Sequence, residues 1–83
     1  MRILIHKDAE KVYDKLDKIS KERIKKGIAG LTEIPPVGDI KNLKGEFTGL
    51  KRLRIGDFRI IYQVLDDIIR INNILPRGSA YKN

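Results

Sequence analysis

The chain has 83 residues, enough for one domain, spanning residues 1–83, with a single core between two layers of structure. Its 18 lysines and arginines exceed its 11 aspartates and glutamates, so the formal net charge of +7 favours an anionic partner such as nucleic acid, an anionic membrane or an acidic protein. With no cysteine and one histidine, it can form neither a disulfide nor a thiolate metal site, and a histidine-based zinc site is not expected.

The apolar part of the N-terminus is too short for a signal peptide, and no apolar run approaches the length of a membrane span. We therefore expect a soluble cytoplasmic protein that makes no membrane contact. We also expect it to use no cofactor and no metal.

The first part of the chain predicts a strand followed by a helix. Residues 2–6 are rich in β-branched side chains and read as a short strand. Asp8 is placed to cap the element that follows. From Ala9 to Ile19 the apolar residues recur every three or four positions, which predicts an amphipathic helix.

A second helix is predicted directly after the first. Ser20 is the expected N-cap, and the apolar stripe runs from Ile24 to Leu31. Pro35-Pro36 ends this helix because proline cannot extend the hydrogen-bond ladder and disfavours helical geometry in the residue before it. Residues 37–49 alternate poorly and contain three glycines, which predicts a loop or an irregular strand.

The segment from Leu50 to Val64 predicts two strands joined by a tight turn. Counted by twos, one face is apolar, with Leu53, Ile55, Phe58, Ile60, Tyr62 and Val64. The opposite face carries Arg52, Arg54 and Arg59. Gly56-Asp57 suits a type II′ turn, because glycine tolerates the positive φ required at the first central position.

The last strand is predicted at residues 68–75, after a second tight turn at Leu65-Asp66-Asp67. Ile69 and Ile71 continue the apolar face. The order β-α-α-β-β-β predicts an α+β fold, in which two N-terminal helices pack on one face of a small, mainly antiparallel sheet and leave the other face to solvent.

The exposed arginines are the best candidates for a functional site. A phosphate-binding glycine loop, a serine nucleophile elbow and carboxylates at metal-ligand spacing are all missing from the sequence. Guanidinium groups bind phosphate bidentately and stabilise charge on a phosphorane-like transition state. Because an RNA 2′-hydroxyl supplies its own nucleophile, such a face suits phosphodiester cleavage without a metal. Arg77 and Tyr81, in the tail after the last strand, could fold over the same face.

A basic strand face is, in small proteins generally, more often a solvated surface or a general nucleic-acid patch than a catalytic site. The residues alone therefore indicate a basic, open-faced α+β domain that meets nucleic acid.

Three segments carry a resemblance to a known family: IKNLKG at residues 40–45, RLRIGDFRIIY at 52–62 and RGSAY at 77–81. With the order of elements, they resemble the RelE/ParE superfamily of toxins from type II toxin–antitoxin systems over nearly the whole chain. The resemblance implies the RelE-like fold. Its RelE branch implies a ribosome-dependent, metal-independent endoribonuclease, an mRNA interferase that cleaves translated mRNA by attack of the 2′-hydroxyl on the adjacent phosphate and so inhibits translation.

The resemblance also implies residue roles. Arg52 and Arg54 match two basic strand positions that hold RNA, and Arg59 matches the phosphate-stabilising arginine. Arg77 matches the tail arginine that acts as general acid or charge stabiliser, and Tyr81 matches the tyrosine that stacks on or orients the substrate.

The strand positions depart from the family in one respect. The best-known RelE enzymes carry lysines there, and a lysine with a lowered pKa is a candidate base, whereas Arg52 and Arg54 are not. Three candidates for the general base stay open: Lys44, Tyr81 and a water molecule. Lys44 is also an expected RNA contact.

Two alternatives stay open at this point. The ParE branch shares the fold and inhibits DNA gyrase, and catalytically inactive members act with their antitoxin as DNA-binding repressors. Arg77 and Tyr81 favour the ribonuclease. The partners that the resemblance implies are a cognate antitoxin, mRNA and rRNA on the ribosome, and operator DNA only through the antitoxin complex.

Overall fold

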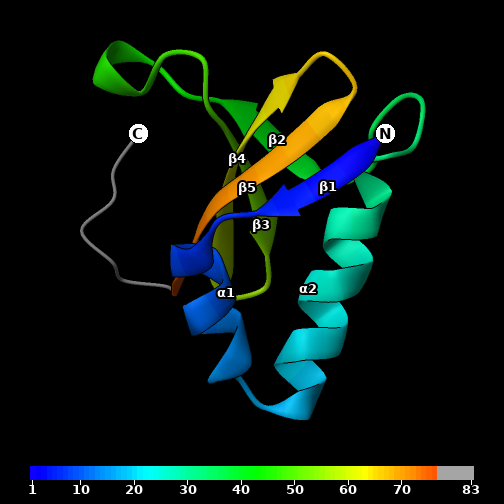
Figure 1. Ribbon diagram of the computed structural model, residues 1–83, viewed down its shortest axis with the longest axis vertical. Coiled ribbons are helices and arrows are strands. Elements are labelled where there is room, and N and C mark those ends of the chain that lie inside the picture. Colours follow the sequence, from blue (N-terminus) through cyan, green and yellow to red (C-terminus); the bar gives the residue numbers. More distant parts are fainter. Residues whose placement is uncertain (77–83) are drawn as a thin grey trace.

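The computed structural model describes residues 1–76 and shows a five-stranded sheet with two α-helices (Figure 1). The elements are β1 (Arg2–Ile5), α1 (Lys7–Asp14), α2 (Lys18–Gly30), β2 (Asp39–Asn42), the 3₁₀ helix η1 (Gly45–Phe47), β3 (Lys51–Ile55), β4 (Phe58–Leu65) and β5 (Ile68–Pro76). The predicted α+β fold, with two N-terminal helices packed on a mainly antiparallel sheet, is confirmed, and the structure adds one strand, β2, to the predicted order β-α-α-β-β-β. Within residues 1–76, neither helix is long and apolar enough to cross a membrane.

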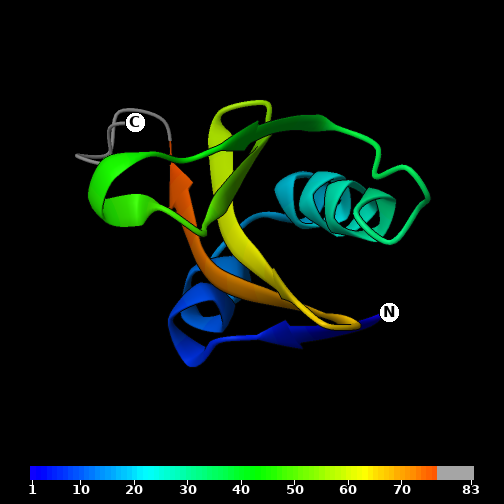
Figure 2. The ribbon, with the colours of Figure 1, turned by 90° about the horizontal axis from the view of Figure 1, so that it is seen from above.

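The strands lie in the order β1-β5-β4-β3-β2. Strands β2 to β5 form an antiparallel meander, and β1 joins its end in parallel with β5. Seen from above, the sheet is strongly twisted, with β1 and β2 at opposite ends and α2 between them (Figure 2). Residues 37–49, predicted as a loop or irregular strand, contain the regular strand β2.

Both predicted tight turns are present. Gly56 has φ 55°, and Asp57 is not among the positive-φ residues, as a type II′ turn requires. In the second turn, Asp66 itself adopts φ 54°, a conformation that aspartate tolerates better than most side chains.

The start of α1 differs from the prediction. His6, not Asp8, is the N-cap, because its Nδ1 accepts a hydrogen bond of 3.1 Å from the backbone N–H of Asp8. The prediction that Asp8 caps this helix is therefore wrong. The sequence signal was misleading because a histidine ring nitrogen took the acceptor role that aspartate usually fills at this position.

The boundary between the helices also differs. Helix α1 ends at Asp14, and Asp17 rather than Ser20 caps α2, since Asp17 Oδ1 accepts a hydrogen bond of 3.3 Å from the Ser20 N–H. Hydrogen bonding with Ser20 lowers the pKa of Asp17. Ile19, predicted as part of the first apolar stripe, belongs to α2 and is 69% exposed. Ile19 therefore does not share an apolar helix face with Leu16, although the two residues are three positions apart in the sequence.

The core lies between the helices and one face of the sheet, called here the covered face. Its buried residues are Ala9, Ile24, Ile28, Leu31, Leu53, Ile60, Tyr62, Ile69, Ile71 and Ile74. A bulge in β5 brings both Ile71 and Ile74 to this face: Ile61 is opposite Asn73 while Tyr62 is opposite Ile71, so Asn72 is the extra residue. Simple alternation would have placed Ile74 on the other face.

Candidate functional site

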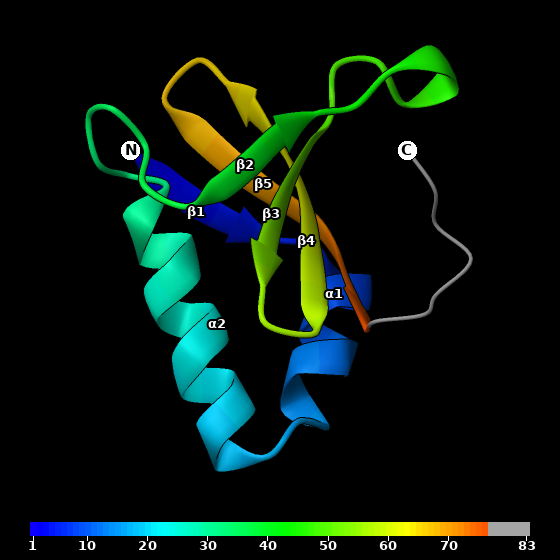
Figure 3. The ribbon, with the colours of Figure 1, turned by 180° about the vertical axis from the view of Figure 1, so that it is seen from behind.

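The sheet face away from the core, called here the open face, carries the predicted arginines. Strand pairing sets them in rows, because residues in register project to the same side. One row contains Asp39, Arg54, Arg59 and Leu75, and the next contains Lys41, Arg52, Ile61 and Asn73. Figure 3 shows the strands that supply these rows, β2 to β5, with the β3–β4 turn between the two helices.

Arg54 and Arg59 are direct cross-strand neighbours on the two sides of the hairpin turn. Side chains in such pairs begin about 5 Å apart, so two positive groups share one small area of the sheet. A small hollow of about 30 Å³ lies there, lined by both arginines and by the turn residues. The predicted grouping of Arg54 with Arg59 is thus present in the structure.

Arg52 is on the same face but is held differently. Its side chain is 13% exposed, and its Nη2 lies 3.5 Å from Asp39 Oδ1 of β2. This carboxylate fixes the guanidinium and offsets part of its charge, so an incoming anion has to compete with Asp39. This pair could not be predicted from local patterns, because it depends on the register of β2 against β3.

A fourth arginine reaches the turn from α2. A Cβ built on Gly56 would lie 3.1 Å from Nη2 of Arg23, so the guanidinium of Arg23 rests against the bare backbone of the hairpin tip. Sequence reasoning missed this residue, because it depends on how α2 crosses the sheet. It extends the positive charge of the open face around the end of the hairpin.

Two buried apolar side chains, Leu43 and Ile61, lie beneath the open face. Leu43 and Ile61 are each 4% exposed, yet neither belongs to the core on the covered face. Ile61 is the cross-strand neighbour of Arg52. Neighbouring side chains cover both residues, so Leu43 and Ile61 support the rows of arginines from below and offer no apolar surface to a ligand.

The remaining predicted site residues are placed less directly. Lys44 is exposed and precedes η1, so it lies past the Lys51 end of β3, about 13 Å along the strand from the turn. The structure does not bring it beside Arg54 and Arg59. Arg77 and Tyr81 lie outside the described residues. The described chain ends at Pro76, which pairs with Phe58 next to Arg59.

Taken together, the guanidinium groups of the open face can hold a polyanion. Guanidinium groups stabilise negative charge but are poor proton acceptors. Burial raises the pKa of Tyr62, but this residue belongs to the covered face and cannot reach a ligand on the arginines.

A sheet backed by two N-terminal helices is also the fold of the small RelE toxins of toxin–antitoxin systems. The chain belongs to the RelE/ParE superfamily of toxins: the family model described as "ParE toxin of type II toxin-antitoxin system, parDE" matches residues 3–81.

Solved structures agree with this assignment. The chain is 36% identical to a chain of the archaeal RelE–RelB complex from Pyrococcus horikoshii OT3, with a TM-score of 0.75 and coverage of 95% of this chain and 97% of that one. The RelB–RelE complex from Methanococcus jannaschii is 26% identical, with a TM-score of 0.72 and 88% of each chain covered. The isolated E. coli RelE toxin, at 19% identity, shares the fold, with a TM-score of 0.76 and coverage of 95% and 86%. The comparison with curated proteins gave no match.

Proposed function

We propose that this toxin is a ribosome-dependent endoribonuclease that cleaves translated mRNA and so inhibits translation. The observation that carries the proposal is the pair Arg54 and Arg59, side by side on the open face with Arg52 in the next row. The identity of 36% with an archaeal RelE supports the RelE branch. The proposal needs no metal, because the RNA provides the nucleophile.

In the proposed reaction, the 2′-hydroxyl oxygen attacks the adjacent phosphorus, so a new P–O2′ bond forms while the P–O5′ bond breaks. Arg59 stabilises the charge that develops on the non-bridging oxygens, and Arg52 and Arg54 hold the RNA in line for attack. Arg77 protonates the leaving 5′-oxygen or neutralises its charge, and Tyr81 stacks on or orients the substrate.

The proton of the 2′-hydroxyl needs an acceptor. Lys44 lies near the Lys51 end of β3, far from Arg54 and Arg59. Tyr81 or a water molecule therefore accepts the proton in the proposed reaction, and Lys44 contacts RNA. Such proton transfer contributes a smaller part of the rate than charge stabilisation does.

The partners follow from the family. The Pyrococcus horikoshii and Methanococcus jannaschii relatives were solved as toxin–antitoxin complexes, which supports a cognate antitoxin for this chain. We further propose that free toxin acts in the cytoplasm, on mRNA and rRNA of the ribosome, and that operator DNA is bound only by the complex.

The test is primer extension on translated messages after controlled expression, with purified ribosomes as a second system. Arg59→Ala should lower cleavage at least about 100-fold, as removal of one stabilising donor does in other enzymes. Arg70→Ala is the matched control, because Arg70 is an exposed arginine of the same face near the distant end of β5. It should retain cleavage within about threefold. Growth arrest with intact messages would refute the proposal.

A second candidate is inhibition of DNA gyrase, which the match to the ParE family model favours. It predicts accumulation of cleaved DNA complexes in a supercoiling assay while cellular RNA stays intact. Normal supercoiling by gyrase in the presence of excess toxin would remove this candidate.

A further inference from the structure

Helix α2 comes close to the hairpin that β3 and β4 form (Figure 3). Gly27 makes this approach possible, because a Cβ at that position would overlap the side chain of Ile55 at the end of β3. Arg23 lies about one helical turn before Gly27, on the same face of α2. The close approach of the helix therefore brings Arg23 to the tip of the hairpin.

The guanidinium of Arg23 lies flat against Gly56. A Cβ built on Gly56 would be 3.1 Å from Nη2, 3.4 Å from Cζ and 3.6 Å from Nη1 of Arg23, so the plane of the group faces this point rather than one of its edges. The N–H groups lie in that plane and therefore point past the hairpin. Among residues 1–76, no aspartate or glutamate forms an ion pair with Arg23. The hairpin thus holds a cation that has no counter-charge of its own in this part of the chain.

Arg23 continues a series of cations that begins on β3. Counted by twos from Arg52, the next positions are Arg54 and Gly56, and successive positions of this series are about 7 Å apart along the strand. The guanidinium of Arg23 lies where a side chain at position 56 would start. Helix α2 therefore supplies the third cation of a series to which the hairpin itself contributes a glycine. A series of this kind can follow the backbone of an extended single strand, which carries a phosphate at every nucleotide.

We propose that Arg23 binds the RNA phosphate next to the one held by Arg54 and Arg59, so that α2 takes part in positioning the substrate. The small hollow lined by Arg54, Arg59 and Gly56 joins the arginine pair to the tip, and a strand bound by the pair can continue directly to Arg23. The inference rests on the proposed function, because it takes RNA as the ligand of the open face. It adds a residue from a helix to a site otherwise built from the sheet and the tail.

The first test measures how the full chain binds RNA oligonucleotides of two lengths. For a hexanucleotide, Arg23→Ala should weaken binding about three- to fivefold at low salt, and the slope of log K against log salt should become shallower by about 0.7, as for one lost phosphate contact. For a dinucleotide, whose single phosphate is held by Arg54 and Arg59, the affinity should not change. Fluorescence anisotropy measures the first and NMR titration the second. Equal losses at both lengths, or no binding of the hexanucleotide by the unmodified chain, would overturn the inference.

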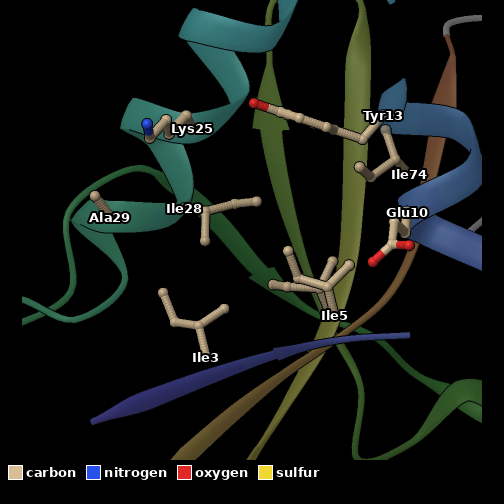
Figure 4. Close-up of a pocket in the computed structure, with 9 residues that line it drawn as sticks. Ile3, Ile5, Glu10, Tyr13, Lys25, Ile28, Ala29 and Ile74 are labelled. Atoms are coloured by element: carbon tan, nitrogen blue, oxygen red, sulfur yellow. The ribbon is translucent and has the colours of Figure 1, made fainter. Parts of the chain in front are cut away.

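Lys25→Ala is the matched control for charge. It removes the same charge from the same helix, but Lys25 lies on the side of α2 that borders an apolar groove of the covered face, beside Ile28 (Figure 4). Its affinity for the hexanucleotide should stay within about twofold, because exposed charges at such a separation are largely screened. Equal losses for Arg23→Ala and Lys25→Ala would contradict the inference, since net charge alone would then explain them.

A second variant tests the placement of the guanidinium without changing the net charge. Gly56 has φ 55°, which asparagine tolerates, and an asparagine side chain there would occupy the place of the Arg23 guanidinium. Gly56→Asn should weaken hexanucleotide binding at least about twofold and should add nothing when combined with Arg23→Ala. Circular dichroism checks the fold, and unchanged dinucleotide affinity checks the arginine pair. Additive losses would show that the turn, and not Arg23, is responsible.

Cleavage on purified ribosomes separates this inference from the proposed reaction. Arg23→Ala should raise KM about threefold and leave kcat unchanged, as loss of uniform binding does, whereas Arg59→Ala should lower kcat. A lowered kcat with unchanged KM in Arg23→Ala would refute the role in binding. So would an Arg23→Ala variant that binds RNA normally but loses affinity for an acidic antitoxin. Hexanucleotide binding that depends on Arg23, in a protein that cleaves no message, would keep the inference and refute only the reaction.

Discussion

The covered and open faces of the sheet perform different work. On the covered face, Ile24, Ile60 and Ile71 are completely buried, and such apolar burial is the main source of stability in a small domain. On the open face, Arg54 and Arg59 are directly opposite each other, and like charges in this position cost stability. Stability and anion binding should therefore respond to different substitutions: stability to those on the covered face, and anion binding to those on the open face.

The largest effect is expected for Ile60→Ala on the covered face. Removal of a fully buried isoleucine side chain should lower the free energy of unfolding by about 2–5 kcal/mol. This is a large part of the roughly 4–12 kcal/mol typical of a domain of this size. Urea denaturation measures it, with Ile19→Ala at an exposed site as control, where we expect about 0.5 kcal/mol or less. A small loss at Ile60 would show that the covered face is not the source of stability.

Arg54→Ala on the open face should weaken RNA binding without lowering the free energy of unfolding. RNA binding should weaken, and the slope of log K against log salt should become shallower by about 0.7 for a single strand, as expected for one lost phosphate contact. The free energy of unfolding should stay constant or rise by about 0.5 kcal/mol, because the repulsion with Arg59 is removed. Fluorescence anisotropy of a labelled RNA oligonucleotide over several salt concentrations, with parallel urea melts, measures both. Loss of stability would mean that the open face also supports the fold.

Local signals explain how much of this organisation could be predicted. The hairpin was readable because alternation from Leu53 to Val64 and the glycine at position 56 act over a few residues. The same alternation assigned Arg52, Arg54 and Arg59 to the open face, and strand pairing confirmed it.

Features that depend on contacts between distant segments were not predictable. The extra residue Asn72 in β5 is defined only by pairing with β4, and the parallel placement of β1 has no local signature. The approach of Arg23 to Gly56 likewise follows from the path of α2. The two N-cap residues were predicted wrongly for another reason. Several polar side chains near the start of each helix can accept a hydrogen bond from the same unpaired backbone N–H groups.

Asp39→Asn should strengthen RNA binding by the open face, whereas Arg54→Ala should weaken it. The substitution removes the carboxylate that lies 3.5 Å from Arg52, so that guanidinium becomes available to phosphate. RNA affinity should rise about two- to threefold, while stability changes by about 0.5 kcal/mol or less, as for other partly exposed ion pairs. Filter binding at fixed salt measures the affinity, and Arg52→Ala combined with Asp39→Asn is the control. If the gain persists without Arg52, it comes from net charge rather than from release of this arginine.

The smallest effect concerns Tyr62, which brings a titratable group to the covered face. Burial raises its pKa above the usual value of 10.0. The unfolded chain therefore ionises this phenol at lower pH than the folded chain, so above about pH 10 the folded state holds more protons and stability falls as pH rises. Tyr62→Phe removes this contribution, and its unfolding free energy should decline less steeply than that of the unmodified protein between about pH 9 and pH 11. Urea melts across that range measure the two slopes, and parallel slopes would show that the phenol of Tyr62 is as well hydrated as a group on the open face.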